Sequence, residues 1–148
     1  PERGTRNFPR AGRTASARGA GAHDGGNRLQ AGEQAQIDIF GEGMRGFAET
    51  GRDTNGQVNK WLVDNCFGDY YTRGGLDYKQ REMITFCFLA AQGGCEPQLT
   101  SHAAANMRVG NGREFLIQIV SQCLPYIGYP RSLNALRCVN DAAKAQAK

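Results

Sequence analysis

The sequence lacks the features that mark a membrane-spanning, secreted or metal-binding chain. Its longest stretch without a charge is residues 115–130, which two prolines and several polar side chains interrupt, whereas a membrane span needs about 20 apolar residues. No apolar segment typical of a signal peptide lies near the first residue. None of the five cysteines has a partner at C-x-x-C spacing. We therefore expect a cytoplasmic chain that enters no membrane and holds no metal ion.

Positive charge is scarce in most of the chain. Residues 1–34 hold six Arg and three acidic side chains, a net charge of +3, and residues 35–148 hold twelve basic and eleven acidic side chains, a net charge of +1. A surface for nucleic acid needs basic residues clustered on one face. We therefore expect the folded part to have no nucleic-acid partner.

The first 34 residues are rich in Gly, Ala and Arg, and Phe8 and Leu29 are their only large apolar side chains. Such a segment buries too little surface to offset the entropy lost on ordering. We interpret residues 1–34 as a flexible arm, either native or an artefact, and residues 35–148 as one folded domain. The arginines of the arm either remain solvated or bind an acidic partner.

Apolar residues recur at helical spacing through the rest of the chain, and no segment alternates with the period of a strand. One face of a first helix carries Ile37, Phe40, Met44 and Phe47. A second, short helix begins near Val58 and ends near Gly68, and residues 69–75 form a connection. The pattern predicts an all-α protein.

The next helix has clear boundaries. Asp77 is a suitable N-cap and Gln80 completes a capping box, while the Gly-Gly step at 93–94 ends the helix. After Glu82 the segment is apolar almost all round, which predicts the central helix of the core.

Two further helices follow. Pro97 suits the first turn of a helix that ends at Gly110, and Asn111 with Glu114 predicts a second capping box. The segment PYIGYP at 125–130 should break the chain, and its last proline opens the final helix.

Several segments together resemble the carboxymuconolactone decarboxylase-like proteins, which share a fold with the alkylhydroperoxidase D group. They carry Gly-Leu-Asp before Arg-Glu, Glu-Pro-Gln before a helical His, and Pro-Tyr-x-Gly-Tyr-Pro-Arg near the end. They are TRGGLDYKQREMIT (72–85), GGCEPQLTSHAAANMRVGN (93–111), GREFLIQIVSQCLPYIGYPRSLNAL (112–136) and, more weakly, QIDIFGEGMRGF (36–47).

The resemblance implies an alkylhydroperoxidase D-like bundle of about six helices. It also implies a ring-shaped homo-oligomer, commonly a trimer or hexamer, and a pocket near subunit contacts that works without a metal or organic cofactor. The redox branch of the family has C-x-x-C-x-x-x-H on one helix and a Glu on the helix before. Counted back from His102, the cysteine places are Cys95 and Gln98, so the dithiol pair is broken and Cys95 lacks a local resolving thiol. Glu82 and His102 match the acid and histidine places.

His102 and Glu82 are the candidate catalytic residues. An imidazole carries protons readily at neutral pH, although a lone helical His is more often a hydrogen-bonded structural residue. Glu82 either stabilises the start of its helix or shares a proton with His102. In a strictly antiparallel hairpin the two would be offset by roughly 7–8 Å along the axis, so a splayed crossing, a water or a substrate would have to close the gap.

Arg131, Gln98 and Cys95 are the candidate substrate-binding residues. Arg131 can bind a carboxylate through two hydrogen bonds or form a salt bridge between subunits. Cys95 and Gln98 share the face of His102 at i, i+3 and i+7, and Cys95 is either a reactive thiol or a turn residue. The other four cysteines are expected to be small buried apolar side chains.

These residues and the resemblance favour a cofactor-free carboxy-lyase that acts on a small carboxylated lactone or related acid. His102 would deliver a proton to carbon, and Glu82 would orient His102. One alternative is a thiol-dependent peroxidase that uses Cys95. Another is a non-catalytic oligomeric module that binds a small acid.

Overall fold

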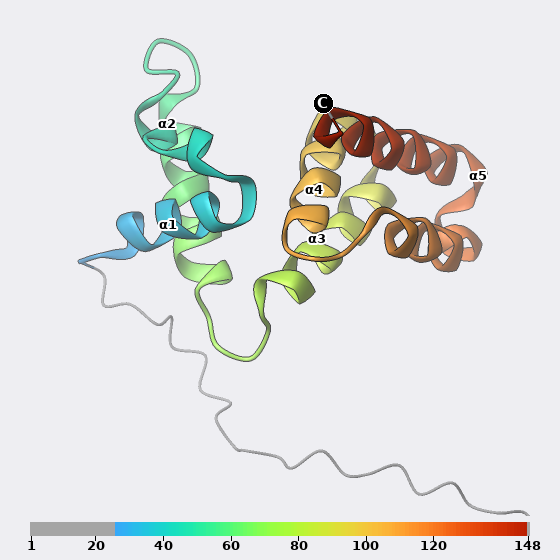
Figure 1. Ribbon diagram of the computed structural model, residues 1–148. Coiled ribbons are helices and arrows are strands. Elements are labelled where there is room, and N and C mark those ends of the chain that lie inside the picture. The colour runs from blue at the N-terminus through green and yellow to red at the C-terminus, as the bar shows by residue number, and fades with distance from the viewer. Residues whose placement is uncertain (1–25, 148) are drawn as a thin grey trace, which may run out of the picture.

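The computed structural model describes residues 26–147, and no residue of that range lies in a strand, which confirms the all-α class. Figure 1 shows the helices, with the bounds that follow. They are α1 (Arg28–Phe40), α2 (Gly56–Trp61), a π-helix η3 (Leu62–Tyr71), α3 (Tyr78–Gln92), α4 (Glu96–Arg108) and α5 (Arg113–Gln146), with 3-10 turns η1 (Glu42–Met44) and η2 (Phe47–Glu49) between α1 and α2.

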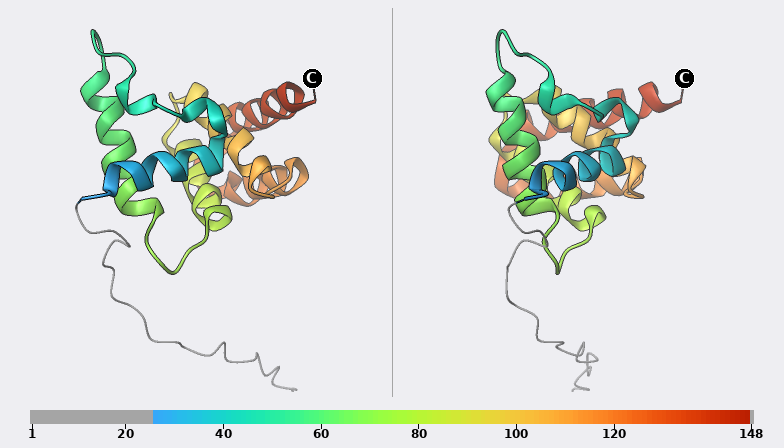
Figure 2. Two further views of the ribbon diagram at one scale, coloured as in Figure 1. Left: turned by 60° about the vertical axis from the view of Figure 1, so that its left-hand side comes forward. Right: turned by 90° about the vertical axis from the view of Figure 1, so that its left-hand side faces the viewer.

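The helices form two packed groups. α1 packs against η3, and α3, α4 and α5 pack on one another; Figures 1 and 2 show the two groups side by side. Each group has its own apolar cluster, and Ala105 of α4 belongs to the cluster of the first group. α4 therefore joins the two groups, and it is the helix that carries His102.

The folded part begins earlier than residue 35. Arg28 opens α1, and its guanidinium donates to Asp64 and, at 3.2 Å, to Asp69 of η3. A Cβ on Gly32 would lie 2.0 Å from the carbonyl oxygen of Val63, so only glycine permits this close approach of α1 and η3. Residues 28–34 thus belong to the fold, and residues 1–25 of the expected arm lie outside the described residues.

The first two expected helices have different ends in the structure. α1 stops at Phe40 because Gly41 takes φ +103°, so the helix expected through Phe47 is replaced by two 3-10 turns. The second helix continues through Gly68 to Tyr71, so residues 69–71 of the expected connection 69–75 are helical. This extension positions Tyr71 beside α3.

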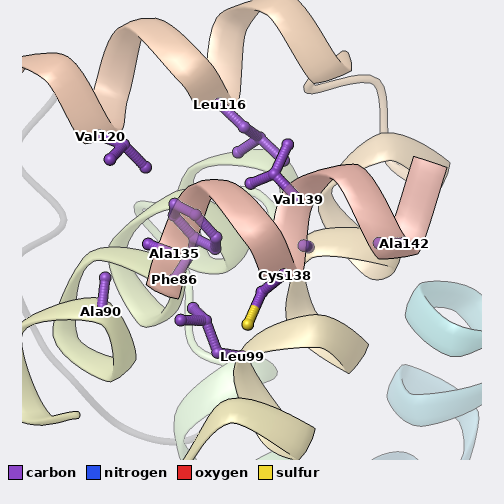
Figure 3. Packing of buried hydrophobic residues seen from close by; sticks show 10 residues of the cluster. Phe86, Ala90, Leu99, Leu116, Val120, Ala135, Cys138, Val139 and Ala142 are labelled. Atoms are coloured by element: carbon purple, nitrogen blue, oxygen red, sulfur yellow. The ribbon is translucent and has the colours of Figure 1, made fainter. Parts of the chain in front are cut away.

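The predicted boundaries of α3 are confirmed. Its predicted burial in the core is confirmed for one face of the helix only. Asp77 accepts from the Gln80 amide at 2.8 Å, and the Gln80 side chain accepts from the Asp77 amide at 3.1 Å. One stripe of the helix is buried, whereas Phe88 is 71% exposed. Figure 3 shows Phe86 and Ala90 of this stripe near side chains of the α5 segments. α3 is therefore a core helix on one face and an apolar surface helix on another.

α4 ends as predicted, but the second capping box is absent. Asn111 is 2% exposed, and its amide donates to the Lys79 carbonyl oxygen at 2.8 Å instead of capping α5. Gly112 takes the N-cap position of α5. The PYIGYP segment does break α5, at Gly128 with φ +76°, and Figure 1 shows the chain reverse direction between the orange and red parts of α5.

The five cysteines are free thiols. Cys138 is buried, as expected, while Cys66, Cys87, Cys95 and Cys123 are half-buried. No helix between residues 26 and 147 is long and apolar enough to cross a membrane.

Candidate active site

His102 and Glu82 are in direct contact. The Nδ1 atom of His102 on α4 lies 2.7 Å from Oε2 of Glu82 on α3. Glu82 is completely buried, and the His102 side chain is 17% exposed. The gap expected for a strictly antiparallel hairpin therefore does not exist, and neither a water nor a substrate is needed to link the two groups.

Tyr71 holds the other oxygen of the Glu82 carboxylate. Its hydroxyl donates to Oε1 at 2.8 Å and lies 2.7 Å from the hydroxyl of Thr85. Burial, followed by the nearby charge of Glu82, raises the pKa of Tyr71 well above its ordinary value, so the hydroxyl keeps its proton and remains a donor. A buried carboxylate needs a hydrogen-bond donor for each oxygen, and Tyr71 and His102 supply them.

The contact with Glu82 determines which edge of His102 is free. Where Glu82 is ionised, its carboxylate can only accept hydrogen bonds, so Nδ1 of His102 is then the donor and Nε2 is the other ring nitrogen. The ring of Phe40 meets the imidazole edge-on, with centroids 5.1 Å apart. Phe40 in turn packs on Phe67. The imidazole is thus held by one polar contact and an aromatic wall, with a small part of its surface open.

Asn106 fixes the two helices at the level of the pair. Its side-chain amide donates to the backbone carbonyl of Glu82 at 2.9 Å and to that of His102 at 2.8 Å. Its own oxygen accepts from Asn111 at 2.8 Å. Asn106 is completely buried, so these bonds have no competition from water, and they hold α3 and α4 in register.

Sequence reasoning missed Tyr71, Asn106 and Asn111 as parts of the site. Asn106 had a usable signal, because an Asn in a helix interior is unfavourable unless its side chain is bonded, and it follows His102 by one turn. Tyr71 is buried. Its hydrogen bond to Glu82 depends on how η3 crosses α3, which no local pattern reveals.

The three predicted substrate-binding residues are not gathered at one point. Gln98 is exposed one turn before His102 on α4. The Cys95 thiol donates to the Leu89 carbonyl at 3.4 Å, and the Arg131 side chain lies against Gly93. Cys95 and Arg131 line a cleft of about 10 Å³, which has room for about one water. This cleft is at the N-terminal end of α4, roughly 10 Å along the helix from His102.

A larger groove of about 500 Å³ lies between α1 and the start of α3. Its walls include Tyr71, Arg73, Leu76 and Tyr78. Tyr71 belongs both to this wall and to the hydrogen-bonded network around Glu82. The groove therefore borders the hydrogen-bonded network at Tyr71.

The arrangement suits proton handling by an imidazole. Among residues 26–147 there is no group of three or more His, Cys, Asp and Glu side chains that could hold a metal ion. The geometry provides a partly exposed imidazole whose Nδ1 atom contacts the carboxylate of the buried Glu82. Such a pair can take up and release a proton at Nε2, the ring nitrogen that does not contact Glu82.

Comparison with known proteins agrees with the resemblance seen in the sequence. A search of curated proteins finds no match. The sequence profile described as the Carboxymuconolactone decarboxylase family matches residues 56–141, more than half of the chain. The matched range contains Tyr71, Glu82, His102 and Asn106, and so the whole hydrogen-bonded network. The chain belongs to the carboxymuconolactone decarboxylase family.

Proposed function

We propose that this protein is a cofactor-free decarboxylase that acts on a small carboxylated lactone or a related acid. In the reaction the bond between the ring carbon and the carboxylate breaks, CO₂ departs, and the electron pair moves into an enolate with the neighbouring carbonyl. A proton then adds to the ring carbon and the carbonyl is restored. The protein has to stabilise the enolate charge and supply that proton.

His102 is the proton donor in this proposal. Its Nε2 takes a proton from solvent and delivers it to carbon, while Nδ1 stays bonded to Glu82 at 2.7 Å. The carboxylate offsets the positive charge that the ring carries while both nitrogens are protonated. Glu82 is completely buried, so it positions His102 and does not touch the substrate itself.

Tyr71 and Asn106 act through Glu82 and His102 and not on the substrate itself. Tyr71 keeps the Glu82 carboxylate turned so that Oε2 faces His102. Asn106 keeps the backbones of Glu82 and His102 at a constant distance. The proposal rests chiefly on one observation, namely a fully buried carboxylate bonded to a partly exposed imidazole.

Gln98 is the substrate-binding candidate that the geometry favours. It is exposed and precedes His102 by one turn on the same face of α4, so its amide can contact a carboxylate or lactone oxygen held at Nε2. Arg131 and Cys95 line a separate cleft with room for about one water. They are proposed to contact the substrate only where a larger part of it extends along α4.

We further propose that the protein works as a homo-oligomer, a trimer or hexamer, in the cytoplasm. α3 and α5 expose large apolar side chains that a single copy leaves in water, namely Phe88, Tyr126, Tyr129 and Leu133, which are 62–82% exposed. A second copy of this chain can cover them. Native mass spectrometry at micromolar concentration should show three or six copies, and a monomer at that concentration would contradict the proposal.

The decisive assay follows CO₂ release from carboxymuconolactone. We expect His102→Ala to lower kcat by about 100-fold or more, the usual contribution of a general acid. Ser101→Ala is the matched control, because Ser101 is the exposed neighbour of His102 and its hydroxyl bonds only back to Pro97 in its own helix. The control should keep the wild-type rate, and both variants should keep the wild-type circular dichroism.

Two outcomes would contradict the proposal. Equal rates in His102→Ala and Ser101→Ala would remove His102 from the mechanism. Absence of CO₂ release from carboxymuconolactone and a panel of related acids, together with tight binding of one of them, would identify a binding module instead. A thiol peroxidase at Cys95 stays the alternative, but the Cys95 thiol donates to the Leu89 carbonyl oxygen and Gln98 occupies the place of a second cysteine.

A further inference from the structure

The groove of about 500 Å³ between α1 and the start of α3 has no role in the proposed reaction. Its volume lies within the range of small-molecule pockets in proteins, about 300–1,000 Å³. The residues of its walls do not include His102, Gln98 or Arg131. The groove is therefore open to a ligand of its own, separate from the substrate at His102.

The apolar part of the groove consists chiefly of two tyrosines and a leucine. Tyr71 and Tyr78 line it and both pack in the apolar cluster of α1 and η3, so their rings are held in place. Leu76 also lines it and is 43% exposed. A flat apolar body in the groove would contact these side chains and remove the exposed part of Leu76 from water, which favours binding.

One wall of the groove is a loop that the protein holds in a fixed shape. Residues 72–77 join η3 to α3 at the lower edge of both views in Figure 2. The Arg81 guanidinium donates to the carbonyl oxygens of Arg73 at 2.6 Å and Leu76 at 3.0 Å. Asp77 fixes the end of the loop by capping α3. A ligand that binds this wall loses little free energy in ordering it.

Arg73 is the charged group of the wall that can still bind a ligand. Its guanidinium lies 4.7 Å from the centre of the Tyr70 ring and forms no ion pair within residues 26–147. Asp77, the other charged residue of the wall, accepts from the Gln80 amide at the first turn of α3, where the helix dipole offsets its charge. The wall thus offers an unpaired guanidinium, whose planar donors match a carboxylate.

We propose that this groove is a second binding site, and that its ligand is a small aromatic carboxylic acid. The carboxylate pairs with the guanidinium of Arg73, and the aromatic rings rest against Tyr71, Leu76 and Tyr78. Tyrosine rings accept another aromatic ring in an offset or edge-on arrangement. The site is separate from His102, and the inference does not depend on the proposed decarboxylation.

The test is a titration of the ¹⁵N-labelled full chain with sodium 2-naphthoate, followed by NMR of the backbone amides. We expect the amide signals of residues 72–77, together with those of Ala31 and Gln34 on the α1 side of the groove, to shift along one saturable curve. The neutral 2-naphthamide keeps the rings and lacks the charge. It should bind at least about tenfold more weakly, because the charged hydrogen bonds to Arg73 are lost.

Two arginine variants locate the carboxylate. Arg73→Gln should raise the Kd for 2-naphthoate by about tenfold, for the same reason. Arg137→Gln is the matched control, because Arg137 is also exposed and without an ion pair among residues 26–147, and it lies on α5 outside the groove. The control should keep the wild-type Kd. Both side chains are exposed, so both variants should keep the wild-type amide spectrum away from the substitution.

A third variant separates this site from the proposed active site. His102→Ala should keep the wild-type Kd for 2-naphthoate, whatever its effect on CO₂ release. Loss of binding in His102→Ala, with binding kept in Arg73→Gln, would place the acid at the proposed active site and overturn the inference. Equal Kd values for Arg73→Gln and Arg137→Gln, or no saturable shift of the groove amides in the wild type, would also overturn it.

Discussion

Replacing Tyr71 by Phe tests how far the buried carboxylate depends on its hydroxyl donor. Phe keeps the ring and its contact with Phe67, whose centroid is 4.5 Å away, and removes only the hydroxyl. The bond of 2.8 Å to Glu82 Oε1 is then lost. Because Glu82 is completely buried, water cannot replace the missing donor.

The expected cost follows from the type of bond. A hydrogen bond to a charged group contributes about 1.5–3 kcal/mol, and an unsatisfied buried charged partner costs at least as much. We therefore expect Tyr71→Phe to lower the free energy of unfolding by about 2 kcal/mol, which corresponds to a fall of roughly 6–10 °C in Tm for a chain of this size.

Chemical denaturation with urea measures this change. Tyr70→Phe is the matched control, because Tyr70 is the preceding residue in η3, is 48% exposed and meets the Arg73 guanidinium through its ring. The control should change the free energy of unfolding by less than about 0.5 kcal/mol. Equal midpoints and slopes for the two variants would refute the idea that Tyr71 satisfies the carboxylate.

Three other perturbations have defined outcomes. Gly32→Ala should lower the unfolding midpoint by the equivalent of about 3 kcal/mol or prevent folding, because its Cβ would lie 2.0 Å from the Val63 carbonyl oxygen; circular dichroism during urea unfolding measures this. Asn106→Ala should cost about 2 kcal/mol in the same assay, because two buried backbone carbonyls lose their donor. The Cys87 pKa is raised in the folded chain from 9.0 to about 11, so this stabilising contribution is present below pH 9 and is lost as the pH rises toward 11. The unfolding midpoint should fall over that interval in the wild type and fall less in Cys87→Ser.

Local signals in the sequence predicted the parts of the fold that depend on neighbouring residues. Asp77 and Gln80 cap α3, Gly93 ends it, and the PYIGYP segment breaks α5, because each effect arises within one turn of the chain. The composition of residues 1–34 was a less reliable guide to where the folded part begins. The residues from 28 onward join α1, since Arg28 and Gly32 obtain their stabilising contacts from η3, more than 30 residues away.

In the site, too, some features could be predicted from the sequence and others depend on how the helices pack. The resemblance identified Glu82 and His102, and the structure places them in contact. Neither the resemblance nor helical periodicity could find the Tyr71 hydrogen bond, because it depends on the position of η3 against α3. The periodicity also treated Phe88 as core, since an apolar side chain that faces solvent in one copy gives the same pattern as one that faces the interior.

The most direct test of the central claim, that His102 and Glu82 act as one unit in proton delivery, is a double-mutant cycle on CO₂ release. The rates of His102→Ala, Glu82→Gln and the double variant are compared with the wild type, with folding checked by circular dichroism. If Glu82 acts only through His102, the double variant should be no slower than His102→Ala alone. Losses in kcat/KM that multiply independently in the double variant would contradict the account.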